Sequence, residues 1–252
     1  MKTITFSSIK GGTGKSSLCI LAANYTAAAG YRVLVIDLDL QNSLSSYYLD
    51  ETGFTDRKNI SRALHDECMR ENIVSTNYMG IELMASSFDL VKLRTISEKT
   101  LVRILPQVAE DFDFCFIDTA PTYDNLILNA VVAADYIISP VCFSQFDFKA
   151  ARFYQDQLKR DTEKLNQWSI VFNFHTSPRS NNPNSIRNQY EELFREAFGD
   201  RILPTVIPQT GLVPRSIDTR EVISEATSKV KLFSAVADLS RHLGVNEGCR
   251  RF

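Results

Sequence analysis

Several features that would place the protein in another class are scarce or absent in its 252 residues. The five cysteines are Cys19, Cys68, Cys115, Cys142 and Cys249, and no two of them have Cys-x-x-Cys spacing. We therefore expect reduced thiols rather than disulfides or a metal cluster, in keeping with a cytoplasmic location. No apolar run approaches the roughly 20 residues that a membrane-spanning helix needs, and the N-terminus lacks the layout of a signal peptide.

A large excess of either charge is also absent, because 28 Lys and Arg residues face 30 Asp and Glu residues and leave a formal net charge of −2. Any nucleic-acid-binding face would therefore have to be a local basic patch. The sequence contains no internal repeat, no low-complexity tract and no linker that would divide the chain. We expect a single domain over residues 1–252, with no helix-turn-helix segment ahead of the first strand.

A glycine-rich stretch near the N-terminus carries the clearest chemistry. Its sequence is Ser8-Ile9-Lys10-Gly11-Gly12-Thr13-Gly14-Lys15-Ser16-Ser17. Compared with the phosphate-loop pattern G-x-x-x-x-G-K-[ST], Gly14, Lys15 and Ser16 are in place. Ile9 stands at the first glycine position, and Lys10 adds a second lysine. Glycines let backbone N–H groups turn towards phosphate oxygens, and the following helix directs its positive end at them.

The surroundings of this loop favour phosphate binding over the alternative, an ordinary glycine turn between a strand and a helix. Ile4 and Phe6 alternate before it as in a strand, and apolar residues recur at helical spacing after it until Gly30. In such a loop Lys15 is expected to pair with the β- and γ-phosphates, and the Ser16 hydroxyl to coordinate Mg²⁺.

Carboxylates follow two apolar stretches that read as buried strands. Asp37 ends the stretch Arg32–Asp37, and Asp39 follows two residues later. Asp118 ends the stretch Phe114–Asp118. Acidic residues at the carboxyl ends of strands beside a phosphate loop are placed to handle Mg²⁺ or an attacking water. The alternative is a capping or turn aspartate.

Strands and helices alternate along the whole chain, which predicts an α/β fold with a doubly wound, mostly parallel sheet and helices on both faces. The expected strands are Met1–Ser8, Arg32–Asp37, Gly80–Ala85, Phe114–Asp118, Tyr136–Val141, Ser169–Phe174 and Arg201–Pro208. Helices are expected over Ile60–Arg70, Glu98–Glu110 (shortened or kinked by Pro106), Asn125–Ala134, Phe148–Leu165, a segment up to Phe198, Val213–Ser224 and Lys231–Leu243. A loop is expected over His175–Asn184, and 43–77 is otherwise hard to place.

Three motifs together resemble those of the ParA/MinD ATPases, the deviant Walker A group of phosphate-loop NTPases. They are Lys10-Gly11-Gly12-Thr13-Gly14-Lys15-Ser16, Asp37-Leu38-Asp39-Leu40-Gln41 and Ile117-Asp118-Thr119-Ala120-Pro121. The resemblance extends along essentially the whole chain, because Asn173 and Ile207-Pro208 also lie where the family places its adenine pocket. The first motif is highly specific, whereas the others are short.

The resemblance implies a role for each matching residue. Lys15 corresponds to the phosphate-binding lysine, Ser16 to the Mg²⁺ ligand and Ser17 to a contact of the α-phosphate. Asp39 corresponds to the acidic residue that positions the attacking water, and the Mg²⁺ hydration shell would be held by Asp37 and Asp118. The residues implied to bind ATP are Lys10, Gly11, Gly12, Thr13, Gly14, Lys15, Ser16, Ser17, Asn173 and Pro208.

Lys10 resembles the family's signature lysine, which reaches across a face-to-face dimer to the ATP of the other subunit. A second cation at the entrance of the loop has no unmet phosphate charge within its own site, and across a dimer it could act as an arginine finger does. The catalytic set implied is therefore Lys10, Lys15 and Asp39. The alternative is a Lys10 that is merely exposed to solvent.

The function implied by the resemblance is that of a ParA-type partition ATPase with weak intrinsic activity. ATP and Mg²⁺ would drive homodimerisation, the dimer would bind DNA without sequence preference and associate with the nucleoid, and a ParB-like partner would trigger hydrolysis and release. One alternative is a MinD-like ATPase that cycles on a membrane, for which the tail Gly244–Phe252 is too short and too polar; no stable membrane association is expected. Another is a metabolic or redox enzyme on the same fold.

The sequence departs from the family pattern at two positions. Leu40 stands where the family usually has proline, and Gln209 stands where many ParA proteins have arginine. The second departure leaves open which basic residues contact DNA. The candidates, as a group, are Arg215, Arg220, Lys229, Lys231, Arg241, Arg250 and Arg251.

Overall fold

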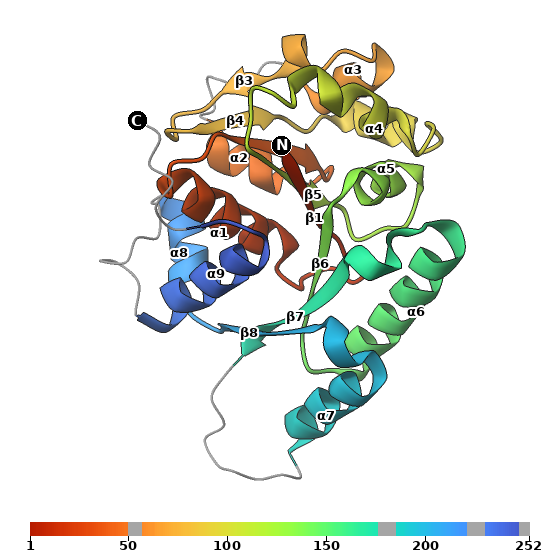
Figure 1. Cartoon of the computed structure of the whole chain (residues 1–252), viewed down its shortest axis with the longest axis vertical. Helices are drawn as coiled ribbons and strands as arrows, with labels where there is room; N and C mark the ends of the chain where they lie inside the picture. The colour runs from red at the N-terminus through yellow and green to blue at the C-terminus, as the bar shows by residue number, and fades with distance from the viewer. Residues whose placement is uncertain (50–56, 176–184, 221–229, 247–252) are drawn as a thin grey trace.

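One eight-stranded sheet runs through the parts of the chain that the computed structural model describes, residues 1–49, 57–175, 185–220 and 230–246 (Figure 1). The strands are β1 (Lys2–Phe6), β2 (Val33–Leu38), β3 (Val74–Ser75), β4 (Ile81–Met84), β5 (Phe114–Thr119), β6 (Tyr136–Val141), β7 (Trp168–His175) and β8 (Ile202–Pro208). Their order is β3-β4-β2-β5-β1-β6-β7-β8, and every neighbouring pair is parallel except β3 and β4. The expected doubly wound, mostly parallel sheet is confirmed.

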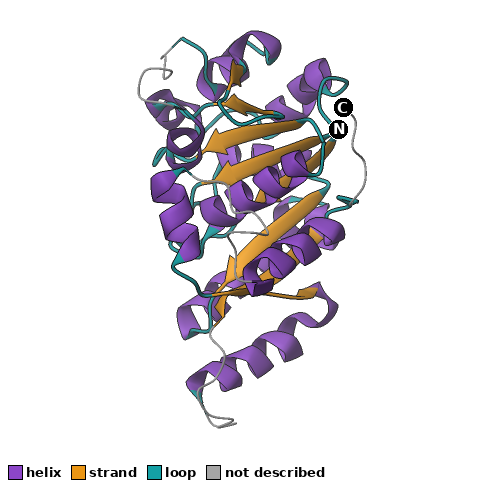
Figure 2. Ribbon diagram, turned by 90° about the vertical axis from the view of Figure 1, so that its left-hand side faces the viewer, coloured by secondary structure: helices purple, strands orange, loops and turns teal. Residues whose placement is uncertain are grey.

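Helices cover both faces of this sheet (Figure 2). Within the described residues they are α1 (Lys15–Ala28), α2 (Ser43–Tyr48), α3 (Ile60–His65), α4 (Thr100–Ile104), α5 (Asn125–Ala133), α6 (Gln145–Asp161), α7 (Ile186–Phe198), α8 (Leu212–Thr219) and α9 (Val230–His242). Short 3₁₀ turns lie at Arg70–Asn72, Phe88–Leu93, Leu105–Val108, Lys164–Gln167 and Gly199–Arg201. Because strands β2 and β5 are covered on both sides, all six residues of each are buried, as their continuous apolar sequences require.

The core has three parts that correspond to the helices above each region of sheet. Leu18 of α1, Leu44 of α2 and Leu239 of α9 belong to one cluster. A second cluster contains residues of α3, α4 and α5, and a third contains residues of α5, α6 and α7. Phe233 of α9 also packs edge-on against Tyr25 of α1, with ring centroids 5.6 Å apart. The C-terminal helix is therefore part of the core, as its apolar spacing predicts.

Several element boundaries differ from the sequence expectation for identifiable reasons. The predicted helix over 60–70 ends at His65, and the one over 98–110 passes from α4 into a 3₁₀ turn that contains Pro106, which lacks the N–H that an α-helix needs. Helix α6 starts earlier than predicted because Ser144 caps it, accepting from the N–H of Asp147. Helix α2 and strand β3 were not predicted. His175, expected to begin a loop, is instead the last residue of β7. The rest of that predicted loop, the end of the helix predicted over 213–224 and most of the tail 244–252 lie outside the described residues.

The sheet topology brings the carboxyl ends of β1, β2 and β5 together. Strand β5 lies between β1 and β2, and the chain order reverses about this point, which is where open α/β sheets bind ligands. In the parallel register, Asp118 lies opposite both Phe6 of β1 and Asp37 of β2. The predicted phosphate loop and carboxylates therefore share one edge of the sheet.

Two further expectations concern cysteines and membranes. In the described part of the chain, Cys19 and Cys115 are buried, Cys68 and Cys142 are partly buried and all four are free thiols, while Cys249 lies outside it. Burial raises the pKa of the Cys19, Cys115 and Cys142 thiols, which makes these thiols poor nucleophiles. Among the helices of the described segments, none combines the length and the apolar composition needed to cross a bilayer.

Candidate functional site

The glycine loop between β1 and α1 ends at a helix start that has no side-chain cap. Gly12 and Gly14 have φ angles of 73° and 93°, in the left-handed region that favours glycine. Gly14 is the N-cap of α1 and offers no side-chain cap, so the first N–H groups of this helix remain available for phosphate oxygens. A side chain at Gly14 would also place its Cβ 2.2 Å from Nδ2 of Asn173. The loop therefore needs glycine here for both backbone conformation and close packing.

Lys15 directs a buried cation into this loop. The residue is 6% exposed, and its Nζ donates to the carbonyl of Lys10 at 3.2 Å and to Oγ of Ser8 at 3.4 Å. Burial lowers the Lys15 pKa, while the charges of Asp118 and Asp39 oppose this shift. The Lys15 ammonium group is thus largely shielded from water, and the nearby carboxylates do not fully compensate for its burial. A bound phosphate would supply the additional negative charge.

Other residues of the loop divide into inward-facing and open ones. Thr13 is buried, with its hydroxyl 3.1 Å from that of Ser8, and thus helps to close the loop. Gly11 and Gly12 are exposed, and Ser16 and Ser17 are half-buried in the first turn of α1. The open positions are those at which phosphate oxygens or a metal can approach.

Two buried carboxylates lie side by side next to this loop. Asp37 and Asp118 are both fully buried and face each other on adjacent strands. Among the residues that the structure describes, Oδ2 of Asp118 has no hydrogen-bond partner. Burial raises the pKa of both carboxyl groups, and the Asp37 charge adds to the shift at Asp118. An orphaned carboxylate oxygen beside the half-buried Ser16 hydroxyl fits Mg²⁺, which prefers oxygen ligands, waters and substrate phosphates.

The described residues contain no group of three or more His, Cys, Asp and Glu side chains that could hold a metal ion by themselves. The pair of carboxylates is thus too small to form an all-protein metal cage. Mg²⁺ at such a site takes its remaining ligands from phosphate and water. The predicted roles of Ser16, Asp37 and Asp118 are compatible with this geometry.

The raised carboxyl pKa values predict how the stability of the ligand-free protein depends on pH. In the folded protein Asp118 stays protonated at a pH where the unfolded side chain has already ionised. The contribution of Asp118 to the stability of the folded protein is therefore complete below the ordinary pKa of about 4, and it is lost as pH rises through the folded-state pKa. We expect the free energy of unfolding to fall by on the order of 4 kcal/mol between pH 5 and pH 8 through this group, whose folded-state pKa is raised to about 8. Urea denaturation without Mg²⁺ measures this. Asp118→Asn, which cannot ionise, should make the profile less steep, with the raised pKa of Asp37 supplying the slope that remains; an unchanged slope would contradict the assignment.

Asp39 lies just beyond the end of β2 and is half-buried. Its Oδ1 accepts the N–H of Gln41 at 2.9 Å, and no ion pair of Asp39 occurs within the described residues. The carboxylate retains acceptor positions for a water molecule. The next residue, Leu40, packs against the second core cluster, so a leucine can replace the family's proline without exposing an apolar side chain.

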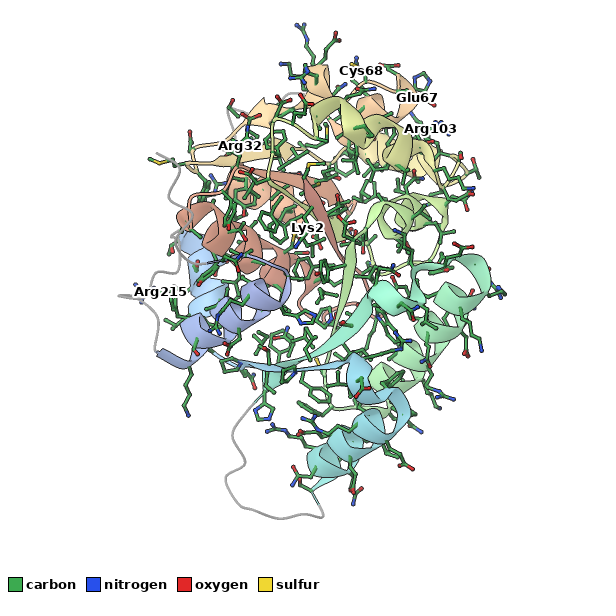
Figure 3. All side chains as sticks on the ribbon, viewed as in Figure 1. Lys2, Arg32, Glu67, Cys68, Arg103 and Arg215 are labelled. Atoms are coloured by element: carbon green, nitrogen blue, oxygen red, sulfur yellow. The ribbon has the colours of Figure 1, made fainter. Side chains whose placement is uncertain are left out.

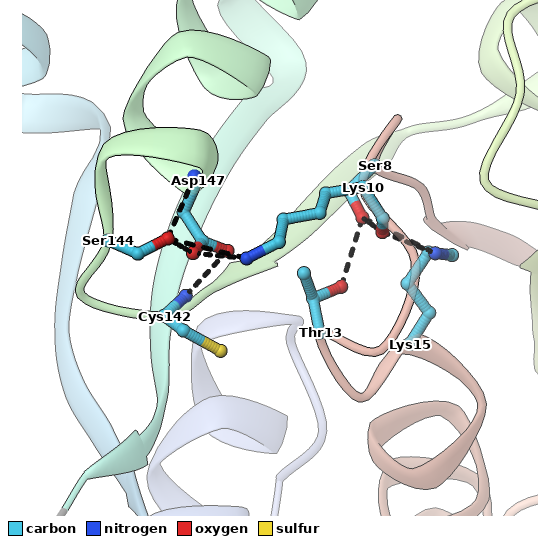
Figure 4. A network of polar contacts seen from close by, with 7 residues as sticks. All are labelled: Ser8, Lys10, Thr13, Lys15, Cys142, Ser144 and Asp147. Atoms are coloured by element: carbon cyan, nitrogen blue, oxygen red, sulfur yellow. Dashed lines mark hydrogen bonds and ion pairs between the residues drawn. The ribbon is translucent and has the colours of Figure 1, made fainter.

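Lys10 does not project freely into solvent. Its Nζ forms an ion pair with Oδ2 of Asp147 at 2.6 Å and lies 3.4 Å from Oγ of Ser144 (Figure 4). The Lys10 side chain is 34% exposed, whereas that of Asp147 is 0% exposed. Asp147 also accepts the N–H of Cys142 at 3.3 Å. The alternative of a merely solvent-exposed Lys10 is therefore wrong for this structure, and the lysine is held within its own subunit.

Sequence reasoning missed Asp147, although a signal was present. Ser144-x-x-Asp147 has the spacing of a helix capping box ahead of an apolar run. That pattern predicts a helix start at residue 145 and a carboxylate at the entrance of α6. It does not reveal that Lys10, 137 positions away in sequence, is the carboxylate's partner.

The two predicted adenine-pocket residues occupy different positions. Asn173 on β7 is 3% exposed, and its Nδ2 donates to the carbonyl of Thr13 at 2.8 Å. It therefore lies directly against the phosphate loop. Pro208 ends β8 and lies opposite His175 in the register with β7. Asn173 thus contacts the glycine loop directly, whereas Pro208 lies on β8, the edge strand next to β7.

Comparison with known proteins shows which family the chain resembles. The model of the AAA_31 family, described as an AAA domain, matches residues 1–168. The chromosome-partitioning ATPase Soj of Treponema pallidum is 28% identical over 216 residues, which cover 82% of this chain and 83% of that protein. The virulence plasmid ParA family protein pGP5-D of Chlamydia psittaci is 24% identical over 251 residues, which cover 96% and 94% of the two chains.

Solved structures share the fold over nearly the whole chain. A plasmid partition protein of Borrelia burgdorferi bound to AMPPNP superposes with a TM-score of 0.77 at 22% identity, covering 96% of this chain and 98% of that one. The ATP complex of a Cyanothece McdA variant has a TM-score of 0.83 at 18% identity, covering 98% and 97%. The arrangement of strands and helices is thus the fold of these two structures.

Proposed function

Because the chain belongs to the AAA_31 family of AAA domains and is a ParA/MinD-type ATPase, we propose that it is a Mg²⁺-dependent partition ATPase of the ParA branch. ATP binding produces a homodimer, the dimer binds DNA without sequence preference, and a ParB-like partner stimulates hydrolysis and release. The relatives described as chromosome-partitioning and plasmid ParA proteins support this branch. The protein would act as a single domain in the cytoplasm and associate with the nucleoid while ATP is bound.

The observation that carries the proposal is the presence of two lysines at one uncapped helix start beside two buried carboxylates. Lys15 points into the loop, and Lys10 lies at its entrance, bound to Asp147 instead of to the loop. A site that only binds a nucleotide needs one lysine in the loop, Lys15. A second cation that can leave its acceptor suits a site completed by another subunit.

Each residue of the site has a separate role in hydrolysis. The backbone donors of Gly11–Gly14 and the Lys15 cation bind and orient the phosphates. The Ser16 hydroxyl, together with Asp37 and Asp118, would hold Mg²⁺ and its water shell, and the bound ion would neutralise charge that develops on the phosphates. Asp39 orients the attacking water, and Lys10 of the partner subunit stabilises charge on the transferred phosphoryl group. Asn173 and Pro208 would border the adenine.

Slow intrinsic hydrolysis follows from this division. Phosphate-loop NTPases that lack a supplied cationic finger lose about 10³–10⁵ in rate. In the single subunit Lys10 is bound to Asp147, so it is not yet available to a neighbour. A partner protein that favours the assembled arrangement would accelerate the reaction, which is the property required of a timed release from DNA.

DNA binding would depend on basic residues of the C-terminal part. Arg215 of α8 is exposed and lies at the periphery of the molecule (Figure 3), and Arg220 and Lys231 are also exposed. Arg241 is paired with Asp238 at 2.6 Å, which makes it a weaker candidate. Lys229, Arg250 and Arg251 lie outside the described residues. A MinD-like membrane cycle is less well supported, because the apolar face of α9 packs on α1 within the core.

An Asp39→Ala protein tests the proposal most directly. We expect hydrolysis to fall by about 10²-fold, because the attacking water loses its acceptor, and the ATP-bound dimer to accumulate. Size-exclusion chromatography with ATP and Mg²⁺ should show the dimer, and the trapped protein should retard DNA fragments of unrelated sequence. Its DNA affinity should fall steeply as salt rises.

Asp66→Ala is the matched control, because Asp66 is an exposed carboxylate paired with His65 at a distance from the loop. It should behave as the unmodified protein. An Asp39→Ala protein that turns over normally, or a trapped dimer that ignores DNA even at low salt, would contradict the proposal. Flotation of that dimer with liposomes would instead favour the membrane-cycling alternative.

A further inference from the structure

Two buried serines connect the segment around Asp39 to the neighbouring strand. Ser45 lies in α2, Ser86 lies two residues beyond β4, and both are 0% exposed. The hydroxyl of Ser86 donates to the main-chain carbonyl of Asp39 at 2.7 Å. The N–H of Ser86 donates to Oγ of Ser45 at 2.9 Å, and that hydroxyl donates to Oδ2 of Asp37 at 2.7 Å. One chain of hydrogen bonds thus links both aspartates.

The direction of every bond in this chain is fixed. A main-chain carbonyl can only accept, so the Ser86 proton goes to Asp39. A backbone N–H can only donate, so the Ser45 oxygen accepts from Ser86 and gives its own proton to Asp37. Asp37 is further tied by the N–H groups of Ser45 at 2.8 Å and Asp39 at 3.1 Å. No hydroxyl is left to rotate, and the network is therefore a rigid one.

The sheet itself does not hold the Asp39 backbone. The ladder between β2 and β4 ends with the pair Ile36 and Met84, and β2 ends at Leu38. Beyond these points the Asp39 carbonyl accepts from Ser86 and from the N–H of Asn42 at 2.9 Å. Asn42 belongs to the same turn as Asp39, so it cannot fix that turn relative to the sheet, whereas Ser86 belongs to a different strand connection.

We propose that Ser86, supported by Ser45, is a positioning residue that fixes the backbone of Asp39 relative to the sheet for the hydrolytic step. The inference rests on the proposed function, in which the Asp39 carboxylate orients the attacking water. Catalytic groups need placement within about 0.5 Å, and a displacement of about 1 Å costs about 10²-fold in rate. Ser86 contacts neither the glycine loop nor Lys15 in the described contacts, so its effect should fall on the rate and not on ATP affinity.

The test is Ser86→Ala, which deletes a single bond. Alanine keeps the N–H that serves Ser45, and the Asp39 carbonyl keeps its bond from Asn42, so no buried group is left without a partner. Single-turnover hydrolysis should slow by about 10–100-fold, while the dissociation constant of a fluorescent ATP analogue should change by less than about twofold. Ser87→Ala is the matched control, because Ser87 is the next residue and its hydroxyl caps a 3₁₀ turn by accepting from Asp89; it should hydrolyse normally.

A double variant separates positioning from a general structural role. If Ser86 acts through Asp39, the protein with both Asp39→Ala and Ser86→Ala should hydrolyse ATP no more slowly than Asp39→Ala alone. If the double variant showed the product of the two single losses in hydrolysis rate, or if Ser86→Ala hydrolysed ATP as fast as the unmodified protein, the inference would be overturned and the proposed function would remain intact. Failure of the unmodified protein to hydrolyse ATP would overturn both.

Discussion

Replacing Lys15 by alanine should lower the affinity for ATP by at least about 10³-fold, which is about 4 kcal/mol of binding free energy. This cation is the one that points into the glycine loop, and it is 6% exposed, so solvent screens it poorly. The negative charges of Asp118 and Asp39 act on Lys15 in the ligand-free protein. Without Lys15, these carboxylates would repel the phosphates, and Lys10 would not offset them because its ammonium group is paired with Asp147.

Isothermal titration with a non-hydrolysable ATP analogue and Mg²⁺ measures this loss. Lys92→Ala provides the control, because Lys92 is an exposed lysine paired with Asp89 at 2.6 Å on the surface; its affinity should equal that of the unmodified protein. Lys15→Met keeps most of the buried side chain without its charge and should lose binding as Lys15→Ala does. Full affinity in Lys15→Met would show that the phosphates bind elsewhere.

The parts of this site that follow the local pattern of the sequence could be predicted. Gly12 and Gly14 are needed for backbone conformation, and Lys15 lies at a fixed offset from them, so the loop is recognisable from a short stretch. Asp37 and Asp118 follow runs of apolar residues buried on both faces of a parallel sheet. Since parallel strands bring their carboxyl ends to one edge, their proximity also follows from the alternation of elements.

The parts that depend on tertiary contacts could not be predicted. Ser45 and Ser86 are ordinary small polar residues in sequence, and only the pairing of β2 with β4 brings them together. Helix α2 was missed because Ser43–Tyr48 has only six residues, too few for the spacing of Leu44, Tyr47 and Tyr48 to stand out as a helical repeat. Tertiary packing stabilises it instead, through the bonds from Asn24 of α1 to the hydroxyl of Tyr47 and from the hydroxyl of Tyr48 to Asn24, both 2.9 Å.

Lys10→Ala should leave ATP binding nearly intact but abolish the ATP-dependent dimer. Lys15 and the backbone donors of the loop supply the phosphate contacts within the subunit, whereas Lys10 is turned away from them towards Asp147. In the dimer Lys10 would have to exchange this carboxylate for the phosphates of the neighbouring site. Loss of that contribution should slow hydrolysis by about 10³–10⁵-fold, as removal of a cationic finger does.

The matched experiment must separate a lost intersubunit contact from a damaged subunit. Lys10→Ala leaves the fully buried Asp147 without its cation, and a stranded buried charge is destabilising by about 3–5 kcal/mol. A second substitution, Asp147→Asn, removes that charge and keeps a side chain of the same shape beside Ser144 and Cys142. The double variant should therefore regain thermal stability and still elute as a monomer with ATP and Mg²⁺.

Asp147→Asn alone should have the opposite effect on assembly, because Lys10 no longer has a carboxylate to leave before it can reach the partner subunit's phosphates. Its dimer should form at about tenfold lower protein concentration, if release of the ion pair costs about 1.4 kcal/mol. Analytical ultracentrifugation with a non-hydrolysable analogue measures both shifts on the same scale. A double variant that dimerises, or an Asp147→Asn protein that dimerises more weakly than the unmodified one while remaining folded, would mean that Lys10 stabilises its own subunit and contributes nothing across the interface.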